Sequence, residues 1–377
     1  MPDKKRVLVA VPSLCVGGVT ASLLGFLALL PLRDWEVTLL LFSKENALRS
    51  AIPEGITVDD AAGGGKLESV RSALSKTLQT PLLRPLFSLA KKCYHRFGST
   101  LLASGSGNAA EYDLAIAYQD GLSTWYMAQR VSAKKKIAFV HTDFTMAQYD
   151  AKQESAVYQN FQEICFGSLA ARDRFLSLLP AFAARCSIVP NVVDRDAIRK
   201  KAEDGNGFTD DFSGLRILTV GRLSHEKGSD KIPGLVKKLD ALQISYHWYL
   251  IGDGPLAASL KETDSENLVL LGVQSNPYPF LNACDVYVQP SDYEGYCIAL
   301  AEARALARPI VTCDFAGARE QIVSGESGII TDFSEDALFQ GIAAVIESAS
   351  LRAKFSQALA GETDPSLSQV QAWISAH

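Results

Sequence analysis

The sequence predicts an α/β protein with two domains, each built on a parallel β-sheet. Its 377 residues are enough for two domains of ordinary size. Two continuous apolar runs, Arg6–Val11 and Leu215–Val220, have the pattern of parallel strands that are buried on both faces. Each run is followed by a glycine-containing loop and a helical pattern. This strand–loop–helix order is typical of a Rossmann-like domain.

The first half of the chain continues this alternation. After the first strand, Pro12–Thr20 is expected to form a loop and Ala21–Leu30 a helix. Ser168 is expected to cap a helix at Leu169–Leu178, because its hydroxyl oxygen can accept a hydrogen bond from the first turn. The further strands expected here are Glu36–Phe42, Ile56–Asp59, Leu114–Ala117, Lys136–Val140 and Ile164–Gly167.

The second half has the same organisation. The polar segment 198–212 predicts the hinge between the domains. Helices are expected from about Ser229 and from Cys297 to Leu306. The further strands expected here are Tyr246–Ile251, Leu268–Leu271, Val286–Val288, Ile310–Thr312 and Ile329–Ile330.

Composition limits the function classes. A net charge of −5 gives no signature of nucleic-acid binding. The seven cysteines form no C-x-x-C pair and no spaced cluster with the five histidines, so free thiols in a reducing compartment are expected and no metal site. Pro12 and Gly17-Gly18 interrupt the apolar N-terminus, which favours a buried strand over a signal peptide, and no transmembrane segment is expected.

Residues 66–97 form a basic amphipathic stretch, with seven lysines and arginines against a single acid, Glu68. Its leucines follow helical spacing and predict a pair of helices. Two interpretations stay open. The pair would lie on an anionic membrane surface, or it would pack on the sheet with a solvated basic face.

The stretch 288–321 has the strongest functional pattern. Glu294 lies in a predicted loop and Glu302 inside the following helix. The N-terminus of that helix has free N–H groups and a partial positive charge. Gly295 leaves room for a ligand to approach the backbone. Such a site suits a ligand with hydroxyl groups at one end and negative charge at the other, as a nucleotide-sugar has.

A second pattern follows the strand Leu215–Val220. In Gly221–Gly228, Arg222 has a planar fork for phosphate oxygens and Lys227 has a compact charge. The helix expected from Ser229 directs its N-terminus to the same place. These groups predict a diphosphate site.

Polar residues also end two strands of the first domain, where open α/β sheets bind ligands. His141 follows Lys136–Val140 and is a site candidate at this position. Asp120, Asp143 and Tyr149 are candidates for the acceptor side, and capping or loop roles are the alternative for each.

The spacing of Glu294 and Glu302 resembles the E-x7-E motif of the retaining, GT-B-type glycosyltransferases of family four (glycosyl transferases group 1), of the kind that makes bacterial polysaccharides. The resemblance covers nearly the whole chain and is strongest over 213–331. It implies a GT-B fold, with two Rossmann-like, doubly wound parallel-sheet domains facing a central cleft. An acceptor-binding domain would span 1–197 and a donor-binding domain 213–360, and a helix in 361–377 would cross back to the first domain.

The resemblance also assigns roles. Glu302 would bind the ribose, Arg222 and Lys227 the leaving diphosphate, and Glu294 the transferred sugar, which His141 would also contact. The catalytic candidates are Arg222, Lys227, Glu294 and His141. The donor-binding candidates are Gly17, Gly18, Gly221, Arg222, Lys227, Gly252, Val273, Glu294, Gly295, Tyr296, Cys297, Ile298 and Glu302.

The implied activity is a retaining transfer of a hexose or N-acetylhexosamine from a nucleoside-diphosphate sugar, with UDP favoured, to a saccharide or lipid-linked saccharide. The setting would be bacterial surface glycan synthesis, in the cytoplasm or at the inner face of the plasma membrane. No Asp-x-Asp pair lies beside Arg222 and Lys227, so no metal and no cofactor besides the donor are expected. A nucleotide-sugar epimerase or hydrolase and a catalytically silent partner subunit are the alternatives. A nicotinamide oxidoreductase fits worst, because the G-x-G-x-x-G fingerprint is missing.

Overall fold

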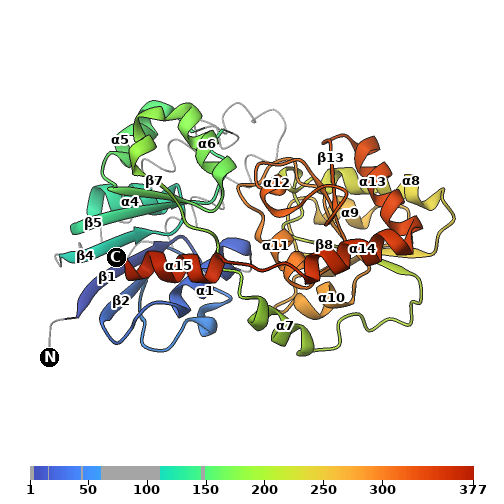
Figure 1. The fold of residues 1–377 in the computed structure, drawn as a ribbon, viewed down its shortest axis with the longest axis horizontal. Helices are drawn as coiled ribbons and strands as arrows, with labels where there is room; N and C mark the ends of the chain where they lie inside the picture. The colour runs from blue at the N-terminus through green and yellow to red at the C-terminus, as the bar shows by residue number, and fades with distance from the viewer. Residues whose placement is uncertain (1–3, 16, 44–45, 61–110, 146–148) are drawn as a thin grey trace. The chain divides into compact units, whose positions relative to one another are not determined.

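The computed structural model describes residues 4–15, 17–43, 46–60, 111–145 and 149–377. The chain divides into two compact units, each with its own sheet (Figure 1). The first unit is Met1–Pro190 together with Gln371–His377, and the second is Asn191–Val370. The predicted basic helices at 66–97 lie outside the described residues.

The first unit contains a seven-stranded parallel sheet in the order β3-β2-β1-β4-β5-β6-β7. Its strands are β1 (Lys5–Val11), β2 (Trp35–Leu41), β3 (Thr57–Asp60), β4 (Tyr112–Ala117), β5 (Ala133–Val140), β6 (Glu163–Phe166) and β7 (Cys186–Ile188). The helices described in this unit are α1 (Gly18–Ala28), η1 (Arg49–Ala51), α4 (Leu122–Arg130), α5 (Ala151–Tyr158), α6 (Leu169–Leu178) and η3 (Pro180–Arg185), and the helix α15 (Ser366–Ser375) ends in it.

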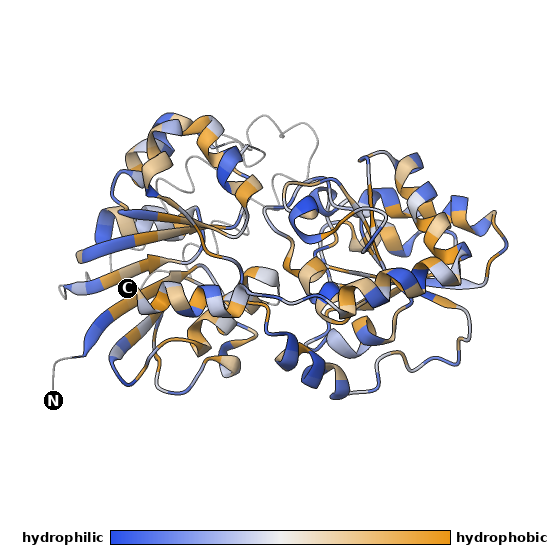
Figure 2. Cartoon of the chain, viewed as in Figure 1, coloured by the Kyte–Doolittle hydropathy of each residue, from blue (hydrophilic) through white to orange (hydrophobic). Residues whose placement is uncertain are grey.

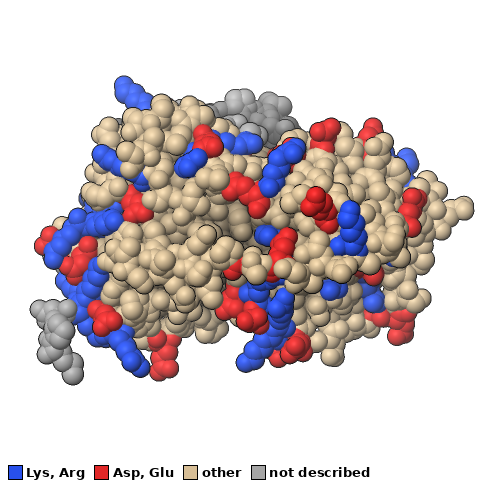
Figure 3. Space-filling view, viewed as in Figure 1, with Lys and Arg blue, Asp and Glu red and all other residues tan. Residues whose placement is uncertain are grey.

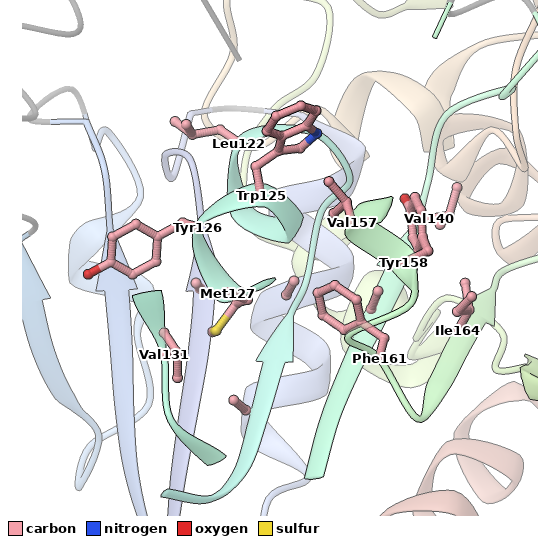
Figure 4. Packing of buried hydrophobic residues seen from close by; sticks show 14 of the residues in the cluster. Leu122, Trp125, Tyr126, Met127, Val131, Val140, Val157, Tyr158, Phe161 and Ile164 are labelled. Carbon is pink, nitrogen blue, oxygen red and sulfur yellow. The ribbon is translucent and has the colours of Figure 1, made fainter. Parts of the chain in front are cut away.

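One hydrophobic core cluster of the first unit lies between its sheet and helices α4 and α5. Figure 4 shows Trp125 and Met127 of α4 in the same cluster as Val157 and Phe161, which come from α5 and the turn after it. Met127 and Phe161 have no exposed surface. Since both helices bury one face on the sheet, the ends of β4 and β5 are held in fixed positions.

The second unit contains a six-stranded parallel sheet in the order β10-β9-β8-β11-β12-β13. Its strands are β8 (Leu215–Val220), β9 (Tyr246–Ile251), β10 (Leu268–Gly272), β11 (Val286–Gln289), β12 (Ile310–Cys313) and β13 (Ile329–Thr331). Its helices are α7 (Arg195–Glu203), η4 (His225–Lys227), η5 (Ser229–Lys231), α8 (Ile232–Asp240), α9 (Ala257–Lys261), α10 (Tyr278–Ala283), α11 (Ile298–Ala305), α12 (Ala318–Gln321), α13 (Glu335–Glu347) and α14 (Ala349–Ala360).

The units separate before the predicted hinge. The division falls between Pro190 and Asn191, whereas the sequence placed the hinge at 198–212. Ile198 and Ala202 of α7 are buried in the core of the second unit, which is why this helix belongs there. The rest of α7 is polar, and the helix is almost wholly blue in Figure 2.

Most strands agree with the sequence prediction to within three residues, but some helices begin elsewhere. Helix α1 begins at Gly18, three residues before the predicted Ala21. The regular helix after β8 begins at Ile232, not Ser229, and the intervening residues form short 3-10 turns. Pro233 lies in the first turn of α8, where its missing N–H costs no hydrogen bond.

The C-terminal residues pack within the first unit. The rings of Phe26 and Phe139 lie 6.0 and 5.6 Å from that of Trp373. Glu163 accepts hydrogen bonds from Trp373 Nε1 at 2.9 Å and from His377 Nε2 at 2.8 Å. Burial alone would raise the pKa of Glu163, but these hydrogen bonds and one from Lys135 lower it to about 2.

Charged side chains of both signs are interspersed on the face of the protein shown in Figure 3. This mixture agrees with the small net charge of −5. None of the helices in the described ranges is long and apolar enough to cross a membrane.

Candidate functional site

The loops that follow β8 and β11 meet in the second unit. These strands are neighbours in the sheet and run parallel, so their carboxyl ends lie at the same edge. The backbone N–H of Asp292 donates to the carbonyl oxygen of Glu226 at 3.1 Å. Gly228 packs against Pro290, since an added Cβ at Gly228 would lie 2.0 Å from the carbonyl oxygen of Pro290. The two loops are therefore joined backbone to backbone.

Two side chains in these loops, Lys227 and Glu294, form an ion pair. Burial opposes the charge on Lys227, but the attraction of the Glu294 carboxylate outweighs it, and the pKa of Lys227 is raised. Ser291 Oγ donates to Glu294 Oε1 at 3.1 Å, and Gln289 Nε2 donates to Ser291 Oγ at 2.7 Å. A chain of hydrogen bonds from the end of β11 thus fixes the carboxylate of Glu294.

Arg222 lies in the same loop as Lys227 and is the more exposed cation, with 63% of its side-chain surface accessible. It pairs with Glu226. Burial would raise the pKa of Glu226, but the nearby guanidinium lowers it. The loop therefore presents two cations, and an incoming anion would compete with a carboxylate for each.

The turn after β9 packs against the backbone of the loop that follows β8. Gly252 has φ +141°, and an added Cβ would lie 1.9 Å from the carbonyl oxygen of Gly221. Gly254 approaches Leu223 in the same way, at 2.4 Å. These positions require glycine because the backbones touch.

The N-terminus of α11 lies after Glu294. Cys297 precedes this helix and has a left-handed backbone with φ 69°, and no side chain caps the free N–H groups. The predicted helix start at Cys297 is therefore one residue early, because helical φ values begin at Ile298. An added Cβ at Gly317 would lie 2.9 Å from Tyr296 Cα, so α12 packs closely on the segment before the helix. Gly295 and Ile298 are both buried there.

Glu302 lies one turn further along α11 and is buried, with 9% of its surface exposed. Tyr278 Oη donates a hydrogen bond to Glu302 Oε1 at 2.8 Å. Burial raises the pKa of Glu302 to about 7, although Tyr278 and the charge of Lys201 act in the opposite direction. A raised pKa means that the carboxylate form costs free energy in this environment.

Val273 is the remaining donor-site candidate of the second unit. It directly follows β10, and 55% of its surface is exposed. It therefore lies at the same edge of the sheet as the loops after β8 and β11, since all three strands are parallel.

The other predicted site residues belong to the first unit. Gly17 is the N-cap of α1, and Gly18 is its first residue, with no side-chain cap. An added Cβ at Gly17 would meet no atom within 4 Å. His141 follows β5, and burial lowers its pKa, so the ring is neutral near pH 7. His141 Nε2 is buried and has no hydrogen-bond partner within the described ranges.

The candidates for the acceptor side have structural contacts. Tyr149 Oη donates to Asp120 Oδ2 at 2.7 Å, and the backbone N–H of His141 donates to Asp120 Oδ1 at 3.1 Å. Asp143 pairs with Arg174 at 2.6 Å. These contacts give Asp120 and Asp143 a structural role within the first unit.

Sequence patterns did not indicate two of the side chains that hold the glutamates, Tyr278 and Ser291. Lys231 was missed in the same way, although it joins the two loops by pairing with Asp292 and donating to the carbonyl oxygen of Pro290 at 3.2 Å. Across the described part of the chain, no cluster of three His, Cys, Asp or Glu side chains has the arrangement of a metal site.

Comparison with known proteins agrees with this geometry. The profile of the family described as glycosyl transferases group 1 matches residues 212–360. An N-acetylgalactosaminyltransferase of Campylobacter jejuni that acts on a diphospho-undecaprenol-linked saccharide is 31% identical over 175 residues, which are 45% of this chain and 46% of that protein. The capsular polysaccharide biosynthesis glycosyltransferase CapM of Staphylococcus aureus is 31% identical over 34% of each chain. The matched stretches thus span less than half the length of these relatives.

Solved structures match over nearly the whole chain at low identity. HepE of Anabaena, in complex with UDP and glucose, aligns with a TM-score of 0.68 and 16% identity over 98% of both chains. TarM of S. aureus, in complex with UDP, aligns with a TM-score of 0.69 and 14% identity over 98% of this chain and 99% of that one. Residues 212–360 therefore match the glycosyl transferases group 1 family, and the two parallel-sheet units and the solved neighbours show that the chain has the GT-B fold.

Proposed function

We propose that this protein is a glycosyltransferase that moves a hexose or N-acetylhexosamine from a nucleoside-diphosphate sugar, with UDP favoured, to a hydroxyl group of a saccharide or lipid-linked saccharide. The observation that supports this most directly is the joining of two loops in the second unit. They bring Lys227 beside Glu294 at the carboxyl edge of the sheet, Arg222 lies in the same loop as Lys227, and Glu302 lies on the helix that follows Glu294.

In this proposal each part of the donor has its own contacts. Arg222 and Lys227 bind the diphosphate, and Glu294 binds hydroxyl groups of the sugar. The N–H groups at the N-terminus of α11, which no side chain caps, lie beside the same sugar. Glu302 accepts hydrogen bonds from the vicinal hydroxyl groups of the ribose, and Val273 flanks the base.

The proposed transfer retains the configuration at the anomeric carbon and needs no metal. The bond between the anomeric carbon and the diphosphate oxygen breaks, and a bond to the acceptor oxygen forms on the same face. The acceptor proton passes to the leaving diphosphate. Arg222 and Lys227 stabilise the negative charge that develops there, which is the task that a divalent cation performs elsewhere.

The relatives support a role in bacterial surface glycan synthesis. The names of the C. jejuni and S. aureus proteins give a lipid-linked saccharide as acceptor and capsular polysaccharide as product. The solved neighbours HepE and TarM both bind UDP. We therefore favour UDP as the nucleotide and a lipid-linked saccharide as the acceptor.

Thermal unfolding with UDP, GDP, ADP, NAD and several UDP-sugars tests the donor site. A ligand at about 100 times its Kd adds about 2.7 kcal/mol to the free energy of unfolding, so a bound nucleotide raises Tm measurably. We expect the UDP shift to become much smaller in Glu302→Ala and Arg222→Ala. A GDP shift instead would change the donor, and no shift with any nucleotide would favour a silent partner subunit.

Turnover assays then test the reaction. Transfer of sugar to a lipid-linked saccharide, with the α-linkage of the donor retained in the product's NMR spectrum, is the expected result. Consumption of a UDP-sugar without an acceptor would favour an epimerase or a hydrolase. Activity that EDTA abolishes and magnesium or manganese restores would refute metal independence.

A further inference from the structure

We propose that Tyr278 is a positioning residue for the donor: its hydroxyl group holds the Glu302 carboxylate in the orientation that accepts the ribose hydroxyls of a nucleoside diphosphate. This inference rests on the proposed function, since it concerns the same donor site. It adds a residue that neither the motifs nor the family match indicated.

The hydrogen bond between these residues leaves half of the carboxylate available. Tyr278 Oη donates to Glu302 Oε1 at 2.8 Å, whereas Glu302 Oε2 has no hydrogen-bond partner within the described part of the chain. A fixed Oε1 also fixes the direction of Oε2, because the carboxylate is planar. Two vicinal hydroxyl groups need both oxygens at set positions, so a rotating carboxylate would bind them less well.

Tyr278 is itself held in place by neighbouring helices. It is the first residue of α10, and its backbone N–H donates to Asn276 Oδ1 at 3.3 Å. Asn276 Nδ2 donates to the carbonyl oxygens of Lys201 and Asp204, at the end of α7, at 2.8 and 3.1 Å. The position of the Tyr278 hydroxyl is therefore set by the packing of α7, α10 and α11 within the second unit.

The groups around the carboxylate favour its charged form only in part. The titratable and charged side chains that face Glu302 are Tyr278 of α10, Lys201 of α7 and Tyr287 of β11. Burial and the nearby Glu302 raise the pKa of Tyr278, so the tyrosine stays neutral and keeps its proton to donate. Lys201 is exposed, and its Nζ lies 5.9 Å from the centre of the Tyr278 ring. Tyr278 is thus the neutral donor that supports a carboxylate with no cation bonded to it.

The test compares UDP with 2′-deoxy-UDP, which lacks one of the two hydroxyls, by calorimetry at pH 7. We expect Tyr278→Phe to weaken UDP binding about tenfold, the loss typical of a hydrogen bond to a charged group. The loss for 2′-deoxy-UDP should be smaller, so the preference for UDP over 2′-deoxy-UDP falls. In a Glu302→Ala background, Tyr278→Phe should cause no further loss.

Tyr246→Phe is the matched control. Its hydroxyl also donates to a carboxylate, Asp240 Oδ1 at 2.7 Å, in the same unit but outside the donor site. This variant should keep the wild-type preference for UDP.

Three results would overturn the proposal while leaving the proposed function intact: UDP binding unchanged in Tyr278→Phe, equal losses for both nucleotides, or the same loss in the Glu302→Ala background. Failure of the wild-type protein to bind any nucleoside diphosphate would instead remove the proposed function, and this inference with it.

If Tyr278→Phe does not fold, Asn276→Ala tests the same contact, because it removes the hydrogen bonds that hold Tyr278 in place. A larger loss of affinity for UDP than for 2′-deoxy-UDP is expected, and equal losses for both would contradict the proposal.

Discussion

Replacing Glu302 by glutamine is expected to stabilise the second unit above pH 7 while weakening nucleotide binding. Glutamine has nearly the same shape, and its amide oxygen can still accept the hydrogen bond from Tyr278. It cannot ionise, so the variant removes only the buried charge.

The size of the effect follows from the pKa of Glu302, which burial raises from 4.5 to about 7. Between these two pH values the folded protein binds more protons at this site than the unfolded chain does. The stability that Glu302 contributes is therefore complete below pH 4.5, falls as the pH rises to 7, and stays low above that. At 1.36 kcal/mol for each pKa unit, the loss is about 3 kcal/mol.

Thermal unfolding of the wild type and Glu302→Gln at pH 5 and pH 8 measures this. The variant should gain relative to the wild type by up to about 3 kcal/mol between the two values. For a domain of 150 to 250 residues this is roughly 6–12 °C in Tm. The same difference in Tm at both pH values would refute the reasoning, because it would mean that Glu302 does not titrate in this range in the folded protein. UDP affinity of the wild type should fall as the pH drops below 7, since the carboxylate is then protonated.

Three further predictions concern other contacts. Gly252→Ala should destabilise the protein by several kcal/mol in urea unfolding, because its Cβ would lie 1.9 Å from a carbonyl oxygen, whereas Gly272→Ala, with no atom within 4 Å, should cost only about 1 kcal/mol for its positive φ. Lys227→Met should reduce kcat about 10²- to 10³-fold in a transfer assay, through loss of charge stabilisation at the leaving group; an unchanged kcat would exclude Lys227 from catalysis. Trp373→Phe should weaken acid resistance: the pKa of Glu163 is lowered to about 2, so its contribution is present above pH 4.5 and is lost as the pH falls towards 2. Acid unfolding at the same pH in variant and wild type would show that this hydrogen bond adds no stability.

The elements that position the proposed donor site were predictable from sequence. The apolar runs of β8 and β11 required a buried parallel sheet, and their loops had to end at one edge. Lys227 and Glu294 are 67 residues apart, yet both are polar residues in the loops that follow such strands, so their meeting could be expected. Ligands of open α/β sheets bind beyond the carboxyl ends of the strands, so the predicted strands indicate the region of a site without any knowledge of side-chain contacts.

The side-chain contacts and backbone conformations within the site were not predictable in this way. Tyr278 and Glu302 are 24 residues apart on different helices, and no periodicity relates them. Cys297 has a left-handed backbone at a position where its residue type gives no indication of one. Helix α7 was placed in the hinge because its polar residues dominate the sequence, although Ile198 and Ala202 are buried. Each of these features depends on how elements pack.

The two glutamates of the motif lie in opposite surroundings, and this difference explains why one ligand should satisfy both. Glu294 is paired with a cation, Lys227, whereas the buried Glu302 has a neutral hydroxyl donor and a raised pKa. Ribose hydroxyls would supply the donors that the Glu302 carboxylate lacks. Phosphate oxygens would offer Lys227 a second partner, and this would free Glu294 for the hydroxyls of the sugar. A nucleoside or a diphosphate alone would meet only one of these needs, so we expect the intact donor to bind more tightly than either part.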